Sequence, residues 1–114
     1  MSQDCIFCKI IAGDIPATLL YEDEDILAFN DISPVAPTHI LVIPRKHITS
    51  PDALTKADQS LIGKLVLKGT QLAEDVGLKN GFRLVMNNGA SAGQTVFHPH
   101  MHVLGGRAMT WPPG

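Results

Sequence analysis

The stretch His98-Pro-His100-Met-His102-Val-Leu104 carries the strongest pattern in this chain of 114 residues. In a β-strand, successive side chains alternate between two faces, so the three histidines would share one face and the apolar residues the other. The α-carbons of His98 and His102 would lie about 13 Å apart at roughly 3.3 Å per residue, which makes one metal ion bound by all three imidazoles difficult. Clustered titratable groups tend to mark functional sites. We therefore predict three histidines with separate roles, the alternative being a solvated strand face.

A glycine-rich stretch from Asn87 to Thr95 comes immediately before the histidines. Glycine permits close backbone approach, so free N–H groups of this stretch can form an anion-binding nest. Most glycine-rich loops are plain turns, but beside a candidate nucleophile this one predicts a phosphate site. The loop and the histidines together indicate phosphoryl or nucleotidyl transfer.

The composition indicates one globular domain over residues 1–114. The hydrophobic fraction is 45% and the charged fraction is 18%, both ordinary for a folded domain. The net charge of −2 offers no basic surface for a nucleic-acid backbone. No apolar run approaches the roughly 20 residues that cross a bilayer, and Lys9 and Asp14 interrupt the apolar stretch that a signal peptide needs. We expect a cytoplasmic protein that binds neither nucleic acid nor membrane.

Hydrophobic periodicity predicts five strands and two helices. The strands are expected at 18–22, 26–30, 39–43, 82–87 and 96–104. A long amphipathic helix has apolar residues at three-to-four spacing from Leu61 to Val76, with Thr55 or Asp58 as its cap and Gly77 as its stop. A short helix is expected at 6–12. The fold class is therefore α+β, with a five-stranded antiparallel meander sheet, one long helix and a short N-terminal helix.

Both cysteines lie in Cys5-Ile-Phe-Cys8. In a reducing compartment, this pair is better interpreted as half of a metal site than as a structural disulfide. Two thiolates at this spacing suit zinc, and two imidazoles would complete a tetrahedron with no open position, so the zinc would be structural. A redox motif is the weaker interpretation, because the pair does not lie in a thioredoxin-like βαβ unit. Two small buried residues are the remaining alternative.

Several further motifs accompany the histidines. They are Phe29-Asn-Asp31-Ile-Ser-Pro34, Ala36-Pro-Thr-His39, Ile43-Pro-Arg-Lys-His47, Gly93-Gln-Thr95, Leu104-Gly-Gly-Arg107 and Trp111-Pro-Pro-Gly114. With the histidine run, they closely resemble the histidine triad (HIT) superfamily, and within it the Hint branch of purine nucleoside phosphoramidases. The resemblance extends from Cys5 to Gly114 and implies the HIT-like fold. The C-terminal Trp-Pro-Pro-Gly favours Hint over the dinucleotide-cleaving and uridylyltransferase branches.

The resemblance implies a catalytic group consisting of His100, His102, His39 and His98. His100 would attack the α-phosphorus, expel an amine and form a nucleotidyl-histidine intermediate that water hydrolyses. His102 would contact the phosphate or the leaving group. His39 would hydrogen-bond within the network that orients His100. The resemblance implies no cofactor for this chemistry.

The resemblance also completes the predicted zinc site. In several relatives, an N-terminal Cys-x-x-Cys pairs around zinc with the positions of His47 and His98. Other Hint members lack the cysteines and bind no zinc. A zinc held by Cys5, Cys8, His47 and His98 would tie the N-terminal segment to the catalytic strand while leaving His100 free.

A further set of residues is implied to hold a purine nucleotide. Asn87, Gly93 and Thr95 resemble the phosphate cradle, and Asp31 resembles the ribose ligand. The apolar slot for the purine would be formed by Ile6, Phe7, Ile10, Phe29 and Ile32. Such apolar residues would be buried in any fold, and Asp31 could simply be a turn residue, so packing and turn formation are the alternatives.

The resemblance implies a homodimer that cleaves the P–N bond of purine nucleoside 5′-phosphoramidates, of the AMP-amine or aminoacyl-adenylate type. The alternatives are a nucleotide-binding adaptor with vestigial hydrolysis, and metal-dependent hydrolysis at a three-histidine site, which the strand geometry disfavours. Thr95 stands where many relatives have serine, and Pro99 where a larger side chain is usual. Because proline removes one ladder N–H, we expect a free edge or a local irregularity at that point of the strand.

Overall fold

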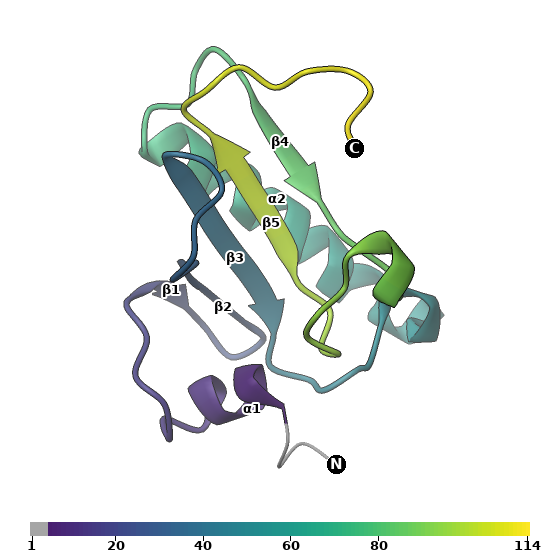
Figure 1. The fold of residues 1–114 in the computed structure, drawn as a ribbon. Helices are drawn as coiled ribbons and strands as arrows, with labels where there is room; N and C mark the ends of the chain where they lie inside the picture. The colour runs from purple at the N-terminus through teal and green to yellow at the C-terminus, as the bar shows by residue number, and fades with distance from the viewer. Residues whose placement is uncertain (1–4) are drawn as a thin grey trace.

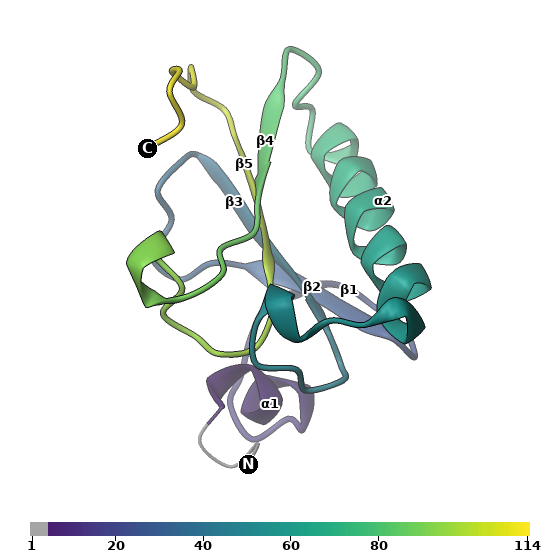
Figure 2. The same ribbon diagram turned by 90° about the vertical axis from the view of Figure 1, so that its right-hand side faces the viewer.

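The computed structural model describes residues 5–114, which form an antiparallel sheet with a long helix packed on one face (Figures 1 and 2). The strands are β1 (Leu19–Glu22), β2 (Ile26–Asn30), β3 (Thr38–Pro44), β4 (Phe82–Val85) and β5 (Met101–Gly105). The α-helices are α1 (Ile6–Ile11) and α2 (Gln59–Asp75), and short 3-10 turns lie at Pro51–Ala53 (η2), Lys56–Asp58 (η3) and Ala90–Ala92 (η4). The predicted α+β class, five-stranded antiparallel sheet, long helix and short N-terminal helix are confirmed.

The strand order is β1-β2-β3-β5-β4, so only the first three strands follow one another as a simple meander. After β3 the chain crosses the sheet as α2 and returns as β4 at the edge, and β5 then fills the place between β3 and β4 (Figure 1). β5 pairs with β3 from Val42↔Met101 to Thr38↔Gly105, and with β4 from Val85↔His102 to Phe82↔Gly105. The last strand is therefore central, with strands on both sides.

Two hydrophobic cores lie on opposite faces of the sheet. The larger one joins α2 to alternate residues of the central strands, including Ile40, Val42 and Val103. Gly69 allows the close approach of α2, because a Cβ there would collide with the Met101 side chain and lie 3.2 Å from Cγ2 of Val103. The second core joins α1 to the other faces of β2 and β3, and it includes Cys5, Phe7, Leu27, Phe29, Leu41 and Ile43.

The ends of α2 follow from local chemistry. Thr55 and Asp58 form a capping box around η3, and Asp58 is the residue that precedes α2, although its side chain makes no cap hydrogen bond there. Its carboxylate instead accepts a hydrogen bond of 2.6 Å from Lys46 Nζ. At the other end, Gly77 has φ of 88°, a conformation that glycine adopts at no steric cost. The predicted stop at Gly77 is confirmed.

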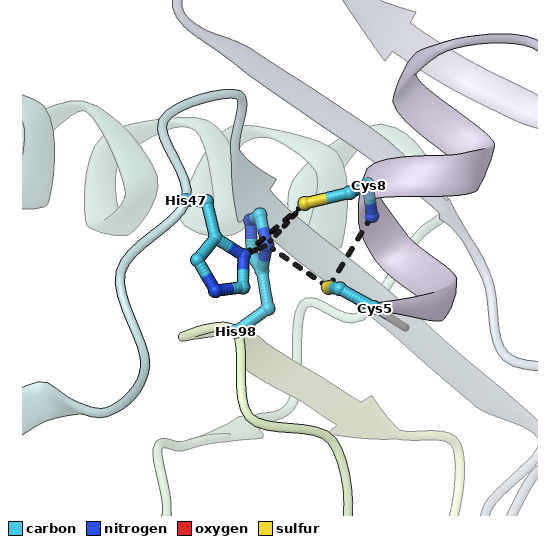
Figure 3. Close-up of side chains that lie close together, drawn as sticks. All are labelled: Cys5, Cys8, His47 and His98. Atoms are coloured by element: carbon cyan, nitrogen blue, oxygen red, sulfur yellow. Dashed lines mark hydrogen bonds between the residues drawn. The ribbon is translucent and has the colours of Figure 1, made fainter. Parts of the chain in front are cut away.

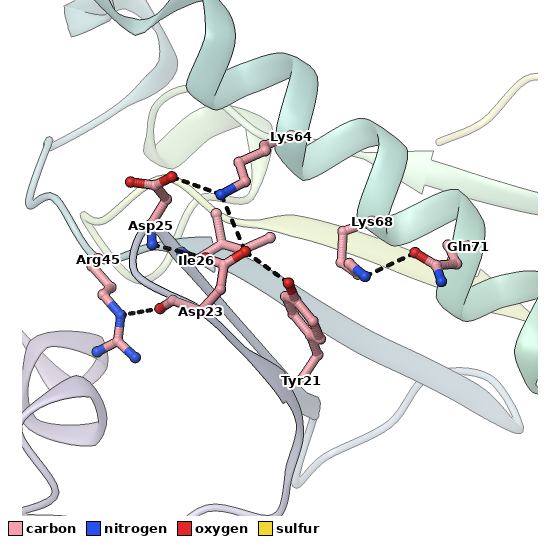
Figure 4. Close-up of polar contacts among 8 residues, drawn as sticks. All are labelled: Tyr21, Asp23, Asp25, Ile26, Arg45, Lys64, Lys68 and Gln71. Atoms are coloured by element: carbon pink, nitrogen blue, oxygen red, sulfur yellow. Dashed lines mark hydrogen bonds and ion pairs between the residues drawn. The ribbon is translucent and has the colours of Figure 1, made fainter.

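A charged network fastens the β1–β2 hairpin to α2 (Figure 4). Lys64 Nζ lies 2.6 Å from Asp25 Oδ2 and 3.1 Å from Asp23 Oδ2, while Tyr21 donates a 2.8 Å hydrogen bond to Asp23. The hydrogen bond to Asp25, followed by the one to Asp23, raises the pKa of Lys64 above its ordinary range. Arg45 Nε donates to the carbonyl of Asp23, so the hairpin turn is held from two sides.

The strand predicted at 96–104 is wrong at its start. Residues 96–100 are not β-strand, and β5 begins only at Met101. Pro99 has no N–H to donate to a ladder, and the His98 ring contributes a hydrogen bond of 2.7 Å to the carbonyl of Pro44 at the end of β3. The expected local irregularity at Pro99 is therefore present, and it places His98 and His100 outside the strand that carries His102.

The remaining chain ends in a C-terminal segment that hydrogen bonds of two arginines connect to β4 and to the loop before β3. Arg83 donates a 2.8 Å hydrogen bond to the carbonyl of Thr110, and Arg107 donates one of 3.1 Å to the carbonyl of Val35. Trp111 is 82% exposed on this segment. Within residues 5–114, neither helix has the length and apolar character required to cross a membrane.

Candidate active site

A cavity of about 420 Å³ lies between α1 and the sheet. All five residues of the predicted apolar slot, Ile6, Phe7, Ile10, Phe29 and Ile32, line it, together with Asp31, Thr95, His100 and His102. The other residues that line it were not predicted from the sequence: Ile15, Pro16, Ala17, Thr18, Asn30, Leu41 and Val96. Leu41 pairs with His102 across β3 and β5, and this proximity follows only from the pairing register of the two strands.

His100 is held in one tautomer by the backbone. Its Nδ1 lies 2.7 Å from the carbonyl oxygen of His98, and a carbonyl can only accept, so Nδ1 carries the hydrogen. In the neutral ring, Nε2 then has the free lone pair. Phe7 packs edge-on against the ring, with centroids 5.0 Å apart. Burial lowers the pKa of His100, which keeps the lone pair unprotonated near neutral pH.

His39 and His102 form a second oriented pair. The N–H of Val35 donates to Nδ1 of His39 over 3.2 Å, so Nε2 of the neutral His39 carries the hydrogen. That Nε2 lies 2.8 Å from Nδ1 of His102, which must accept. His102 consequently has its hydrogen on Nε2, where no residue among 5–114 accepts it. His39 was expected within the network that orients His100; in the structure it is hydrogen bonded to His102, while His100 is oriented by the carbonyl of His98.

The pKa values of this pair are lowered by the surrounding structure. Burial, followed by the proximity of His100 and His39, lowers the pKa of His102 to about 4. Burial also lowers the pKa of His39, although Asp31 opposes this, its Oδ2 lying 3.5 Å from His39 Nε2. Both rings are therefore neutral near pH 7.

Asp31 serves a turn and faces the cavity at the same time. Its Oδ1 accepts a 2.7 Å hydrogen bond from the N–H of Ser33, as in an Asx turn. Its other carboxylate oxygen is directed towards His39. Ile32, the next residue, is 95% exposed at the rim of the cavity. This placement is compatible with both interpretations of Asp31 from the sequence, as a turn residue and as a ribose ligand.

The predicted phosphate cradle divides into two parts. Thr95 lines the cavity, and neither its N–H nor its hydroxyl is hydrogen bonded to another described residue. Gly93 has φ of 97°, and a Cβ there would lie 3.6 Å from Nδ2 of Asn87, so these two residues are neighbours. Asn87 and Gly93 do not line the cavity themselves. Thr95 is therefore the cradle residue that has donors available and lines the same cavity as His100.

The four predicted zinc ligands converge on one point (Figure 3). Cys8 Sγ lies 3.1 Å from His47 Nδ1, Cys5 Sγ lies 3.4 Å from His98 Nδ1, and the two Nδ1 atoms are 3.3 Å apart. Ligand atoms of a tetrahedral zinc are about 3.3 to 3.8 Å apart, as expected for Zn–N and Zn–S bonds of about 2.0 and 2.3 Å. The residues present therefore fit a zinc ion.

The hydrogen bonds of the ligands also fit a metal. Because His98 Nε2 donates to the carbonyl of Pro44, its Nδ1 has a free lone pair directed at the thiols. Burial, followed by contact with Cys5, raises the pKa of the Cys8 thiol to about 11. A divalent cation favours thiolate, so it would reverse this effect and bind both sulfurs.

A second group with ligand spacing is formed by Asp31, His39 and His102. His39 Nε2 carries a hydrogen, however, because Nδ1 accepts the N–H of Val35. Metal binding through Nε2 would move that hydrogen to Nδ1, where it would face the N–H of Val35. The geometry disfavours a metal ion here. It also disfavours a three-histidine metal site, since His98 is directed to the cysteines.

The buried neutral histidines should make the fold less stable in mild acid. The pKa of His102 is about 4 in the folded protein, whereas an unfolded histidine titrates near ~6.5. Between these values the unfolded chain binds more protons, so this contribution is complete above about pH 6.5 and declines as the pH falls to about 4. We expect the urea midpoint to decline across this window, and less steeply in His102→Gln. Equal slopes for the two proteins would contradict the expectation.

Comparison with known proteins agrees with this geometry. A family model described as the HIT domain matches residues 12–109. An uncharacterized HIT-like protein of Synechocystis is 53% identical over 114 residues, the whole of both chains. A HIT family hydrolase from Legionella pneumophila is 50% identical, with a TM-score of 0.95 over 97% of this chain and 100% of that one. A histidine triad protein from Clostridium difficile is 42% identical, with a TM-score of 0.90 over 95% of each chain.

The inferred resemblance to the HIT family therefore holds for most of the chain and for its three-dimensional structure. The named relatives are described by family or as hydrolases, without a stated substrate. With its buried histidines beside an apolar cavity, this chain belongs to the HIT domain family and is a hydrolase-like member of it.

Proposed function

We propose that this protein is a purine nucleoside phosphoramidase of the Hint branch, acting through a nucleotidyl intermediate on His100. The observation that carries the proposal is the free Nε2 lone pair of His100, which the Nδ1–H···O=C bond to His98 holds beside the cavity. An oriented, unprotonated imidazole is a competent nucleophile towards phosphorus. The neighbouring donors on Thr95 and His102 support a phosphate as the group attacked.

The substrate is proposed to lie along the cavity from its apolar end to the histidines. The purine would stack among Phe7, Phe29 and the aliphatic side chains around them. The ribose hydroxyls would donate to the carboxylate of Asp31. The phosphate would accept from the N–H and hydroxyl of Thr95, and the Nε2–H of His102 would point at the phosphate or the leaving nitrogen.

The proposed reaction has two steps at one phosphorus atom. His100 Nε2 bonds to phosphorus as the P–N bond breaks, the leaving nitrogen takes up a proton from solvent to depart as the amine, and the ring becomes positively charged. The carbonyl of His98, which already accepts Nδ1–H, stabilises that charge. Water then attacks phosphorus, the Nε2–P bond breaks, the water releases one proton to solvent in place of the one that the amine took up, and neutral His100 is restored. Over the cycle, water supplies the hydroxyl of the nucleotide and the hydrogen that the amine carries away.

His100→Ala tests this role. We expect turnover of a tryptamine-linked adenosine phosphoramidate to fall by at least about 10³-fold, because the nucleophile is lost. AMP binding should persist, since the apolar slot and Thr95 remain. Wild-type protein should also show a mass increase of one nucleotidyl group after rapid quenching. Equal turnover by the two proteins would contradict the role of His100, and AMP binding without turnover by wild type would favour the nucleotide-binding adaptor.

The zinc site is part of the same proposal, and it has a structural role. Zinc would link Cys5 and Cys8 of the N-terminal segment to His47 and to His98, which precedes the nucleophile by two residues. A bound zinc supplies cross-linking here and no open coordination position. The proposal assigns the enzyme to the reducing cytosol, where thiolates remain available for the metal.

Elemental analysis tests the zinc site. Freshly purified protein should contain about one zinc per chain, and Cys8→Ser should contain much less, because one of four ligands is lost. Chelation should lower the thermal midpoint and increase amide exchange in α1. Protein that contains no zinc and takes up none from solution would rule the site out.

We also propose that the protein is a homodimer. β4 lies at the edge of the sheet, so one side of its backbone can pair with another strand. Leu67 on α2 is 74% exposed and Trp111 is 82% exposed, which are apolar surfaces of the kind that oligomers bury. The family resemblance implies that strands of two subunits join and that the C-terminal tail reaches the partner's site.

Light scattering measures the assembly directly. The expected mass is twice the 12.3 kDa of one chain. A truncation that removes the segment from Trp111 onward should leave the protein dimeric if the strands carry the association, because β4 remains intact. A single-chain mass for the full-length protein at micromolar concentration would contradict the dimer.

A further inference from the structure

Gln94 is a buried polar residue near the end of the glycine-rich stretch, shortly before the candidate nucleophile. Its side chain is only 2% exposed. The amide nevertheless makes three hydrogen bonds, all to backbone atoms. A buried amide without partners is costly, so a fully paired one in this position rigidifies the segments that it joins.

The first hydrogen bond closes the glycine loop upon itself. Oε1 of Gln94 accepts from the N–H of Gly89 over 2.8 Å, while the N–H of Gln94 donates to the carbonyl of Gly89 over 3.1 Å. Both backbone groups of Gly89 are therefore bonded to one residue. The enclosed segment contains η4 and Gly93, whose φ of 97° turns the chain towards Thr95. One side chain thus defines the size and exit direction of the loop.

The other two hydrogen bonds connect the loop to its surroundings. Nε2 donates to the carbonyl of Thr49 over 2.8 Å and to the carbonyl of Val96 over 3.1 Å. Thr49 lies two residues after His47, which belongs to the Cys/His cluster formed by Cys5, Cys8, His47 and His98. Val96 lines the cavity. Thr95 lies between Gln94 and Val96 in the chain, so the hydrogen bond between these two residues restrains the backbone of Thr95.

We propose that Gln94 is a positioning residue for phosphate binding: its buried amide fixes the free donors of Thr95 beside His100. The inference rests on the proposed function, since it assumes that the cavity binds a nucleotide phosphate. Gln94 itself touches no substrate. The three bonds orient the backbone on both sides of Thr95, and the apolar slot formed by α1 and β2 does not depend on them.

The experiment compares binding of AMP and of adenosine, which differ only in the phosphate. In Gln94→Met, which keeps a similar volume but none of the hydrogen bonds, the AMP dissociation constant should rise at least about tenfold. The adenosine dissociation constant should change by less than about twofold, because the slot is unaffected. Gln71→Met is the matched control, a glutamine exposed on α2 that should leave both constants unchanged.

A second variant separates positioning from general stability. Gln94→Glu can still accept from Gly89 N–H but cannot donate to Thr49 and Val96 as a carboxylate, so it tests the two outward bonds while the loop closure is kept. We expect weaker AMP binding and unchanged adenosine binding, with thermal midpoints recorded for every variant. If Gln94→Met does not fold, this variant carries the test.

If the variants bind AMP and adenosine more weakly by the same factor, the role of Gln94 is merely structural and the proposal is overturned. Unchanged AMP binding in folded variants would also overturn it. Wild-type protein that binds neither ligand would refute the proposed function, and the role of Gln94 with it. Wild-type binding of AMP together with unaltered binding by both variants would refute the role of Gln94 alone.

Discussion

The arrangement of this molecule depends on the hydrogen bond from Nδ1 of His100 to the carbonyl oxygen of His98, 2.7 Å long. It determines which nitrogen of His100 has a free lone pair, and it limits rotation of the ring. The carbonyl of His98 is itself held in position, because the fully buried His98 ring is hydrogen bonded to Pro44 and faces the cysteines. One residue therefore belongs to the Cys/His cluster through its side chain and to the candidate active site through its backbone.

Burial supports the same chemistry through the pKa values of the histidines. An imidazole that is removed from water is disfavoured as a cation, and neighbouring imidazoles add repulsion if more than one is protonated. His39, His100 and His102 therefore remain neutral where an exposed histidine would begin to titrate. A neutral ring presents one donor and one acceptor, so backbone contacts alone can decide the direction of every hydrogen bond in the group.

The topology explains how distant motifs meet. β5 enters the sheet between β3 and β4, which brings His102 opposite Leu41 and near His39 at the start of β3. The segment before β5, which includes Pro99, is not paired as a strand, and this allows His98 and His100 to face different sites. A regular strand through residue 98 would have placed all three histidines on one face and left the cysteines without their second imidazole.

From the sequence alone, the elements that depend on local periodicity were predictable: the strand at 26–30, the long helix and its stop at Gly77, and the apolar character of the slot. The spacing of Cys5 and Cys8 and the motifs shared with the HIT family also identified the four candidate zinc ligands and the residues around His100. These features are carried by neighbours along the chain or by patterns of residue type, so they can be recognised without coordinates.

Other features arise only from long-range contacts. The insertion of β5 between β3 and β4, the pairing of His39 with His102, and the separation of His98 from His100 all depend on which segments meet in space. The role of Gln94 was invisible for the same reason, since its partners Gly89, Thr49 and Val96 are backbone groups that any residue would supply. Residue types indicated the chemistry available to this chain, whereas tertiary packing decided the tautomer and direction of each group, because a hydrogen bond forms only where the distance and angle between donor and acceptor allow it.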